Sequence, residues 1–424
     1  MTRALPVPPD AVHWITERLE EAGFETWTVG GAVRDALLGT PGGDWDLATR
    51  ATPKEMQRLF RRTVPIGVDH GTVGVLKDGT MYEVTTFRKD VETDGRHAVV
   101  AFADSIDDDL SRRDFTINAI AWHASKQSLH DPFDGAADLD RGILRTVGRA
   151  EDRFREDYLR ILRAFRFAGK YGLRIDAAAW AAACDLVGGL PDLSAERVRE
   201  ELLKILDADP DPTAALHHYR DSGALAVLYA ELHERGTQSD GEAWWADRLA
   251  IVARLPTGRP MLRLAALLRD VEASRAAAML VRLRLSNRDT DWVARVAGAA
   301  PIPALDATST SVRVWLARFG PDLLNPVVRI ELARARARGP VPRGAEIVAG
   351  WRQAKDVLRT APPLTVSDLA IDGRELKRLG LRPGPLFGRI LEALLEWVLE
   401  DPERNDATVL GTRAVAIART LEGA

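Results

Sequence analysis

The sequence predicts an α+β domain at the N-terminus, a mixed β-sheet with helices, followed by an all-α remainder. Strand-like runs of apolar and β-branched residues are confined to the first third of the chain. From Glu151 onward, apolar residues recur at helical spacing almost to the C-terminus. A length of 424 residues exceeds what one hydrophobic core normally organises, so we expect several domains.

The composition is that of a globular protein, with 46% hydrophobic and 28% charged residues. A net charge of -4 argues against a large non-specific nucleic-acid surface but allows a local basic track. The single cysteine, Cys184, excludes an internal disulfide and a cysteine-rich zinc site. No apolar run is long enough to span a bilayer, and residues 1–10 lack a signal-peptide core. We therefore expect a cytoplasmic protein with no membrane partner.

The first third alternates helix and strand signals. Residues 9–22 have amphipathic helical spacing that ends at Gly23. A short apolar strand then leads into Gly30-Gly31, and residues 32–38 are compatible with a helix. Thr52-Pro53 marks a second helix start. Residues 64–76 and 81–87 predict strands, separated by a hairpin-type turn at 77–80.

Two features close to these elements suggest chemistry. Asp44 and Asp46 are two apart, so on a strand both carboxylates would lie on one face and Trp45 on the other. Two such charges repel unless a cation lies between them, and Mg²⁺ prefers oxygen ligands. Gly30-Gly31 at a helix start offers backbone N–H groups to a phosphate. Each feature alone is equally typical of an ordinary turn or a helix cap.

Glu83 lies within an otherwise apolar and β-branched run, where an unpaired carboxylate is costly. It is a candidate third metal ligand beside Asp44 and Asp46. The alternative is a solvent-facing glutamate on an edge strand, because antiparallel strands alternate polar and apolar faces.

Three further segments are polar. Residues 88–100 form a charged, glycine-containing loop or short hairpin. Arg112-Arg113-Asp114, followed by Asn118, suits nucleotide phosphates and ribose hydroxyls, or is a charged helix start. Residues 154–171 predict one helix whose polar face carries Asp157, Arg160, Arg163 and Arg166, either for base recognition or as a salt-bridged surface.

The last third is helical and rich in arginine. Residues 372–385 predict a helix ending at Gly380 and a second helix beginning after Pro383-Gly384-Pro385. Backbone N–H groups there suit an RNA phosphate, and a plain helix-turn-helix is the alternative. Histidines 217, 218 and 233 lack convincing metal-ligand spacing.

Several motifs occur in a fixed order along the first half of the chain. They are Gly30-Gly31-Ala-Val-Arg34-Asp35, Asp44-Trp-Asp46, Glu83-Val-Thr-Thr, Asp94-Gly95-Arg96-His97, Arg112-Arg113-Asp114-Phe-Thr-Ile-Asn118, Asp131-Pro, and Glu156-Asp157-Tyr-Leu-Arg160 continued by Arg163 and Arg166. This ordered set resembles the bacterial and eukaryotic class of CCA-adding tRNA nucleotidyltransferases, which also contains bacterial poly(A) polymerases. The resemblance is strong over about the first half of the chain and looser in the tail.

The resemblance implies a hook-shaped protein with a catalytic head at residues 1–147 and a nucleotide-selecting neck at 148–208. A helical body at 209–305 and a tail at 306–424 would bind tRNA, with no DNA partner. In the tail, the tRNA contacts would be Arg374, Lys377, Arg378 and Arg382.

By the same resemblance, Asp44, Asp46 and Glu83 would be catalytic and bind two Mg²⁺ ions. The nucleotide, CTP or ATP, would be held by Gly30, Gly31, Arg34, Asp35, Arg112, Arg113 and Asn118. Its base would be selected by Asp157 and Arg160, with support from Arg163 and Arg166. Asp94, Gly95, Arg96 and His97 would belong to a flexible loop.

The predicted activity is template-independent addition of C, C and A to the 3′ end of tRNA. The intact loop disfavours an enzyme that adds only the cytidines, and the lack of a longer insertion disfavours poly(A) tailing. Addition of only the terminal A stays open. A non-catalytic tRNA-binding protein with the same fold is a further alternative, which the three carboxylates argue against.

Overall fold

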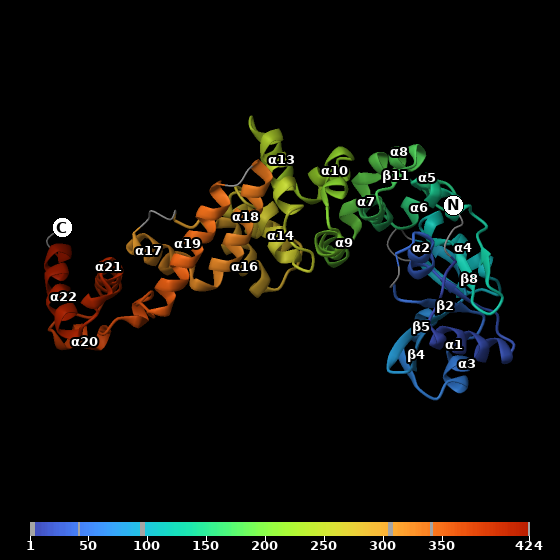
Figure 1. Cartoon of the computed structure of the whole chain (residues 1–424), viewed down its shortest axis with the longest axis horizontal. Helices are drawn as coiled ribbons and strands as arrows, with labels where there is room; N and C mark the ends of the chain where they lie inside the picture. The colour runs from blue at the N-terminus through green and yellow to red at the C-terminus, as the bar shows by residue number, and fades with distance from the viewer. Residues whose placement is uncertain (1–4, 41–42, 94–97, 304–307, 340–341, 423–424) are drawn as a thin grey trace. The chain divides into compact units, whose positions relative to one another are not determined.

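A computed structural model gives the fold of the chain except for residues 1–4, 41–42, 94–97, 304–307, 340–341 and 423–424. The chain forms two compact units, residues 1–235 and 236–424. A mixed sheet with helices occupies the N-terminal part of the first unit, and the rest is helical apart from two short pairs of strands (Figure 1). The predicted fold class is thus confirmed, whereas the four-part division of the chain stays a prediction.

The main sheet has seven strands in the order β3-β4-β5-β2-β1-β8-β9. Six strand pairs hold it together, and β2 and β5 are parallel while the other pairs are antiparallel. The strands are β1 (Thr26–Val29), β2 (Asp46–Thr49), β3 (Thr63–Gly67), β4 (Thr72–Lys77), β5 (Thr80–Thr86), β8 (Ala121–His123) and β9 (Ser128–His130). The predicted single strand at 64–76 is wrong in one respect, because the 3₁₀ turn Val68–His70 separates β3 from β4.

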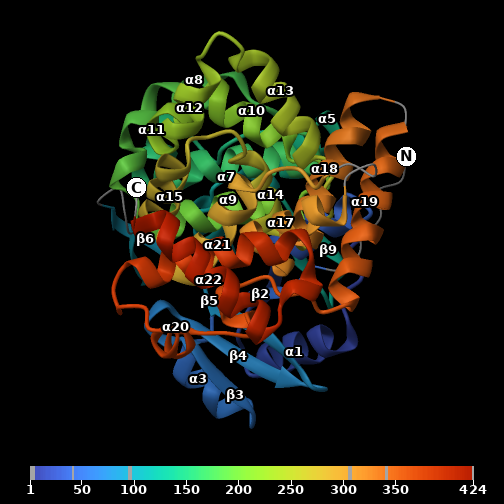
Figure 2. The ribbon, with the colours of Figure 1, turned by 90° about the vertical axis from the view of Figure 1, so that its left-hand side faces the viewer.

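Helices α1 (Asp10–Glu21) and α3 (Pro53–Leu59) cover one face of this sheet (Figure 2). Val12, Ile15 and Leu19 of α1 are fully buried there against Leu47 and Val84 of the central strands. The predicted amphipathic helix is therefore confirmed. Residues that alternate with Leu47 and Val84 point to the opposite face, where Asp46 and Glu83 belong.

The opposite face is only partly covered. Helix α4 (Ile106–Ser111) packs there through Ile106 and Leu110 against Val29 and Ala48. A separate two-stranded hairpin, β6 (Arg88–Thr93) and β7 (Ala98–Phe102), follows β5. The short hairpin foreseen at 88–100 is thus present, while Asp94, Gly95, Arg96 and His97 lie outside the described residues.

The chain leaves the sheet through α5 (Gly135–Arg141), β10 (Ile143–Leu144) and α6 (Ala150–Glu156). Helix α7 (Leu159–Tyr171) then begins after a break at Asp157, whose backbone is extended with φ -159°. The strand β11 (Arg174–Ile175) returns to pair with β10. The first unit is completed by α8 (Ala177–Leu186), α9 (Ala195–Ala208), α10 (Thr213–Asp221), α11 (Ala224–Leu228) and most of α12 (Ala230–Gly236).

Residues 236–424 contain helices only, within the described part of this unit. They are α13 (Gly241–Val252), α14 (Pro260–Leu267), α15 (Ala273–Arg282), α16 (Asn287–Gly298), α17 (Ser309–Phe319), α18 (Leu324–Arg338), α19 (Pro342–Arg359), α20 (Gly373–Arg378), α21 (Leu386–Glu400) and α22 (Ala407–Glu422), with short 3₁₀ turns between some of them. Across the described ranges, no helix is long and apolar enough to cross a membrane.

Candidate active site

A cavity of about 610 Å³ opens on the partly covered face of the sheet, within the first unit. Its walls come from β2, β4 and β5, from the start of α2 (Gly31–Leu37), from the segment after α4 and from α7. Of the predicted site residues, it is lined by Gly30, Gly31, Arg34, Asp46, Glu83, Arg112, Arg113, Asn118, Asp157, Arg160 and Arg163. Residues that the motifs place far apart in the sequence therefore meet around one space.

The acidic wall consists of Asp46 and Glu83. Leu47 of β2 pairs with Val84 of β5 in parallel register, so the residues just before them lie side by side on the cavity face. Strand β5 lies between β4 and β2, so Glu83 is not on an edge strand, although its side chain is exposed as that alternative expected. Burial, the charge of Glu83 and that of Asp44 raise the pKa of Asp46 to about 6, against a smaller lowering by Arg113.

Asp44 differs from the prediction that it shares a strand with Asp46. Strand β2 begins only at Asp46, and Asp44 is exposed in the segment before it. Trp45 between them packs against the core on the α1 side, as the alternation of faces predicts. Asp44 is not part of the cavity wall but is close enough to raise the pKa of Asp46.

The donor set fits a divalent cation in its chemistry. A partly buried carboxylate that is repelled by two neighbouring carboxylates is stabilised when a cation lies among them. Within the described part of the chain, however, no three histidine, cysteine, aspartate or glutamate side chains are already grouped closely enough to hold a metal. Asp46 and Glu83 both line the cavity, whereas Asp44 does not.

Gly30 and Gly31 form the cavity wall next to Asp46. The backbone of Gly30 has φ 77°, which favours glycine, and a Cβ there would lie 3.2 Å from Nη1 of Arg113. A Cβ on Gly31 would lie 3.5 Å from Nη2 of Arg34. Two arginines therefore approach this backbone closely, which makes the segment electropositive.

Arg34 is 5% exposed and is bonded on every nitrogen. Its Nε donates to Asp35 (2.8 Å), its Nη1 to the side-chain oxygen of Asn118 (2.6 Å) and its Nη2 to the hydroxyl of Tyr171 (2.5 Å). Asp35 does not line the cavity, because its carboxylate is turned to Arg34 and Tyr171. A role for Asp35 in positioning Arg34 fits this geometry better than the predicted direct nucleotide contact.

The segment after α4 supplies the basic wall. Arg113 donates from Nη2 to Asp109 (3.0 Å) and from Nη1 to the backbone oxygen of Asn118 (3.2 Å). Arg112 lines the cavity, and its backbone oxygen accepts from Nη2 of Arg160 (3.2 Å). This segment leads into a 3₁₀ turn rather than an α-helix, so the alternative of a charged helix start is wrong.

Asp157 does not lie on a helix with the arginines, which corrects the predicted single helix from 154 to 171. Its Oδ1 accepts the backbone N–H of Leu159 (3.1 Å), so it acts as a cap where α7 begins. Its Oδ2 accepts from Nη2 of Arg197 on α9 (2.7 Å). Arg160 pairs with Glu156 through Nη1 (2.6 Å). Both predicted base-selecting residues still line the cavity.

The two further arginines of α7 differ in position. Arg163 lines the cavity and pairs with Asp114 (2.6 Å). Burial alone would raise the pKa of Asp114, but Arg163 and a hydrogen bond from Asn118 outweigh it and hold the pKa below its usual value. Arg166 is not among the lining residues and pairs with Glu201 (2.6 Å). The polar face of α7 is therefore salt-bridged, as the alternative expected, and part of the same face lines the cavity.

Sequence reasoning missed several lining residues, namely Thr72, Thr85, Arg88, Asp109, Leu159, Phe167 and Arg197. Asp114 stands inside the Arg-Arg-Asp motif, and its buried position between Arg163 and Asn118 explains that acid. Arg197 comes from α9 and carries no sequence signal that links it to Asp157.

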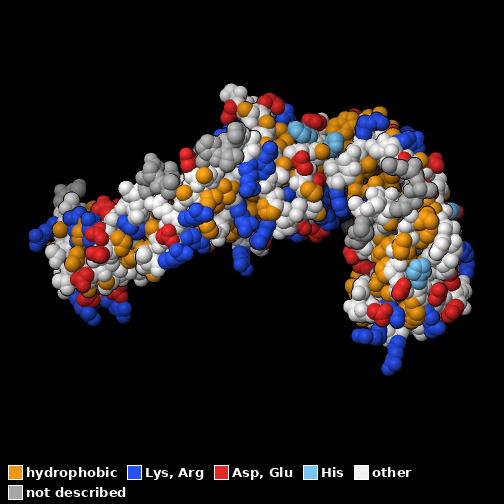
Figure 3. Space-filling model, viewed as in Figure 1, with side chains coloured by type: hydrophobic (Ala, Val, Ile, Leu, Met, Phe, Trp, Pro, Cys, Tyr) orange, Lys and Arg blue, Asp and Glu red, His pale blue; other side chains and the backbone are white. Residues whose placement is uncertain are grey.

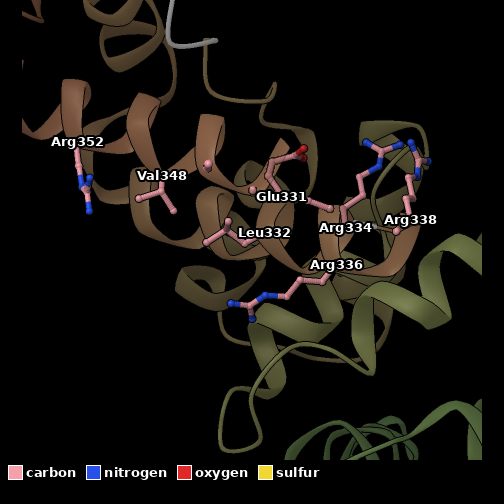
Figure 4. Close-up of a pocket in the computed structure, with 11 residues that line it drawn as sticks. Glu331, Leu332, Arg334, Arg336, Arg338, Val348 and Arg352 are labelled. Atoms are coloured by element: carbon pink, nitrogen blue, oxygen red, sulfur yellow. The ribbon is translucent and has the colours of Figure 1, made fainter. Parts of the chain in front are cut away.

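Residues 236–424 contain a second cavity, of about 650 Å³, between α18 and α19. In Figure 4, Arg334 and Arg338 point to one side, where both approach Asp247, while Arg336 and Arg352 point away from them. Lys and Arg side chains also gather over the helices of this unit on the face shown in Figure 3.

The predicted tail contacts lie on and after α20. Arg374, Lys377, Arg378 and Arg382 are all exposed. Arg374 pairs with Asp372 (2.8 Å) and Arg378 with Glu375 (2.9 Å). Helix α20 ends before Gly380 and α21 begins at Leu386, as the turn residues predicted. Their role toward RNA stays a prediction.

The architecture and the cavity can now be compared with known proteins. Residues 26–145 match the family described as the poly A polymerase head domain, and residues 172–235 match a probable RNA and SrmB-binding site of polymerase A. The CCA-adding enzyme of Lactiplantibacillus plantarum is 34% identical over 97% of this chain and 98% of its own length. The chain belongs to the CCA-adding enzyme family. It is accordingly a tRNA nucleotidyltransferase.

Solved structures of this family agree. The Bacillus stearothermophilus CCA-adding enzyme in complex with CTP is 31% identical, covers 98% of this chain and all of its own, and has a TM-score of 0.74. The Thermotoga maritima CCA-adding enzyme complexed with tRNA shares the fold at 21% identity and a TM-score of 0.60, over 97% of both chains. The resemblance inferred from the ordered motifs is therefore confirmed.

Proposed function

We propose that the cavity of the first unit is where this enzyme adds C, C and A to the 3′ end of tRNA, taking CTP and ATP in turn. One observation carries this assignment: Asp46 and Glu83 line the same space, of about 610 Å³, as several arginines. An acidic wall suits cations, and the arginines suit a triphosphate. The space is large enough for one nucleotide, since ligand pockets typically measure roughly 300–1,000 Å³.

Asp46 and Glu83 would hold Mg²⁺, with Asp44 turning in as a third ligand. When bound, Mg²⁺ supplies a lowered pKa for the primer's 3′-hydroxyl and neutralises charge on the leaving pyrophosphate. The three carboxylates would orient the hydroxyl and the α-phosphate for in-line displacement. The protein's share of the catalysis is mainly positioning and charge stabilisation.

The basic wall would hold the nucleotide's phosphates and sugar. Arg34 and Arg113 flank the Gly30-Gly31 backbone, where a triphosphate would find both cations and the backbone N–H groups at the start of α2. Arg112 and Asn118 line the same space and would contact phosphate and ribose. Phosphate contacts are the same for CTP and ATP, so these residues would serve both substrates.

Asp157 and Arg160 would distinguish the bases. Asp157 offers acceptors and Arg160 donors, which suits the Watson–Crick edges of cytosine and adenine. Arg197 and Glu156 hold the two side chains in place, and a rigid polar site rejects a base that leaves buried donors unpaired. Arg163 and Arg166 would support them through their own ion pairs with Asp114 and Glu201.

The tRNA would bind along residues 209–424, the predicted body and tail, where many arginines are exposed. The arginine-rich cavity between α18 and α19 supports this proposal, as do the exposed basic residues of α20. A cytoplasmic location and the absence of a DNA partner stay predictions.

The test is incorporation of labelled CTP and of labelled ATP, each with Mg²⁺, into two tRNA primers. One primer ends before the cytidines and the other after them. We expect CTP to extend the first primer and ATP the second. Incorporation of ATP alone would instead assign the chain as an enzyme that adds only the terminal A, and long A tracts would indicate poly(A) tailing.

Metal-ligand variants test the acidic wall. Asp46→Ala and Glu83→Ala should each lower incorporation of both nucleotides about a thousandfold, the effect of losing roughly 4 kcal/mol of transition-state stabilisation. Binding of tRNA should be unchanged. Asp104→Ala, at an exposed position of the same unit, is the control. Substantial turnover by Asp46→Ala would remove that residue from the catalytic set.

A further inference from the structure

Tyr171 is the last residue of α7, and its hydroxyl is hydrogen-bonded to Arg34 and to Asp35, the neighbour of Arg34. The hydroxyl accepts from Nη2 of Arg34 (2.5 Å) and donates to Oδ1 of Asp35 (3.0 Å). The guanidinium also stacks on the Tyr171 ring at 4.4 Å from its centre. One hydroxyl therefore closes a three-member set in which Arg34, Asp35 and Tyr171 each contact the other two.

Arg34 lines the cavity, and the three residues hydrogen-bonded to it do not use all of its N–H groups. Of the five N–H groups of a guanidinium, Nε and Nη2 serve Asp35 and Tyr171, and one N–H of Nη1 serves Asn118. Among the residues that the structure describes, none takes the second N–H of Nη1, which is left for a ligand. Nη2 lies close to Gly31, in the segment where the triphosphate is proposed to bind.

The same network fixes α7 at two points. Arg163 pairs with Asp114, which accepts from the amide nitrogen of Asn118 (2.9 Å), and Asn118 in turn accepts from Arg34. Tyr171 lies eight residues after Arg163, a rise of about 12 Å along the helix. Helix α7, which carries Arg160 and Arg163, is thus linked to Asn118 through Arg163 and Asp114, and to Arg34 through Tyr171.

A purely structural role would not require the hydroxyl. The Tyr171 ring already stacks on Phe167 with centroids 6.1 Å apart, and a phenylalanine would keep that packing. The hydroxyl adds only the polar contacts to Arg34 and Asp35. Burying the hydroxyl is unfavourable unless its hydrogen bonds compensate, so we infer that its contribution is to orient Arg34.

We propose that Tyr171 is a positioning residue for the nucleotide's triphosphate. Its hydroxyl holds the Arg34 guanidinium at the phosphate side of the cavity and couples it to the base-selecting helix α7. This inference rests on the proposed function of the cavity. It extends that function by assigning a role to a residue that does not line the cavity and that no motif singles out.

The variant Tyr171→Phe isolates the hydroxyl. We expect the KM for both CTP and ATP to rise at least about tenfold, as the loss of one hydrogen bond to a charged group produces, with kcat within about twofold. Inhibition by pyrophosphate should weaken in parallel, because it shares the phosphate contacts, while the KM for tRNA and the choice between C and A stay unchanged. Tyr82→Phe, on the α1 side of the sheet, removes a hydroxyl as the control and should change nothing.

A double-mutant cycle separates positioning from general stability. In an Arg34→Lys background, Tyr171→Phe should add little to the loss of CTP affinity, because the two residues act as one unit. Additive losses would overturn the inference, as would an unchanged nucleotide KM in Tyr171→Phe. An equal rise in the tRNA and nucleotide KM values would also overturn it. A wild-type protein that incorporates no nucleotide would instead refute the proposed function itself.

Discussion

The raised pKa of Asp46 leads to a prediction that links stability to function: Asp46→Asn should abolish activity and yet make the metal-free protein more stable. Asp46 is partly buried, and Glu83 and Asp44 add negative charge around it. Its ionised form is therefore unfavourable in the folded state when no cation is present. An asparagine keeps the shape of the side chain and removes the charge.

The magnitude follows from the shift. The pKa of Asp46 rises from 3.8 to about 6, and roughly two units at ~1.4 kcal/mol each give an upper value of about 3 kcal/mol. The side chain faces an open cavity, so solvent screening reduces this to about 1–2 kcal/mol. Between pH 4 and pH 6 the folded state binds more protons than the unfolded state, so this group's contribution to stability falls as the pH rises.

Amide hydrogen exchange in β1, β2 and β5 measures this effect in the sheet, separately from the helical unit. With EDTA at pH 8, we expect the free energy of opening of these amides to be about 1–2 kcal/mol higher in Asp46→Asn than in the wild type. The difference should vanish near pH 4, and Mg²⁺ should stabilise the wild type more than the variant. Asp104→Asn is the control. A variant that is less stable than the wild type at pH 8 would refute the reasoning.

Three further predictions concern two residues that line the cavity and one glycine that packs against η2. Asp157→Ala should lower the preference for CTP and ATP over UTP by about tenfold, the effect of losing roughly one hydrogen bond of discrimination, and competitive incorporation measures it. Arg163→Gln should lower the free energy of unfolding by about 3–5 kcal/mol, because the substitution leaves the buried carboxylate of Asp114 without its cation. Urea denaturation measures this loss. Gly135→Ala should lower the free energy of unfolding by about 1–3 kcal/mol. A Cβ at this position would lie 2.0 Å from the backbone oxygen of Thr116, the first residue of η2 (Thr116–Asn118). Thermal denaturation checks it against Gly188→Ala, where a Cβ meets nothing within 4 Å.

The parts of the site that follow from strand geometry could be predicted from the sequence. Alternation predicted that Asp46 and Trp45 point to opposite faces, and Glu83 stood out as a carboxylate in an otherwise apolar strand. The register of β2 and β5 brings the two carboxylates together. Gly30 was recognisable because a strand that turns sharply into a helix requires a backbone that favours glycine.

The parts that depend on distant partners could not be predicted. Arg197, Glu201 and Tyr171 act through residues tens of positions away, and no local pattern in the chain announces such a contact. Asp157 was misplaced for a different reason. Periodicity continues through it, whereas its side chain caps the next helix and ends the previous one, because aspartate competes well for backbone N–H groups.

The ion pairs around the cavity explain how one space can receive both a metal and a triphosphate. Arg113, Arg160 and Arg163 each bring a carboxylate of their own, so the basic wall is largely neutralised by the protein before any nucleotide arrives. A free wall of arginines would bind any polyanion, including RNA backbone, in the wrong register. Asp46 differs from them, because its strongest charged neighbour, Glu83, is also negative. The electrostatic cost is thus concentrated on one carboxylate, which together with Glu83 would hold a cation.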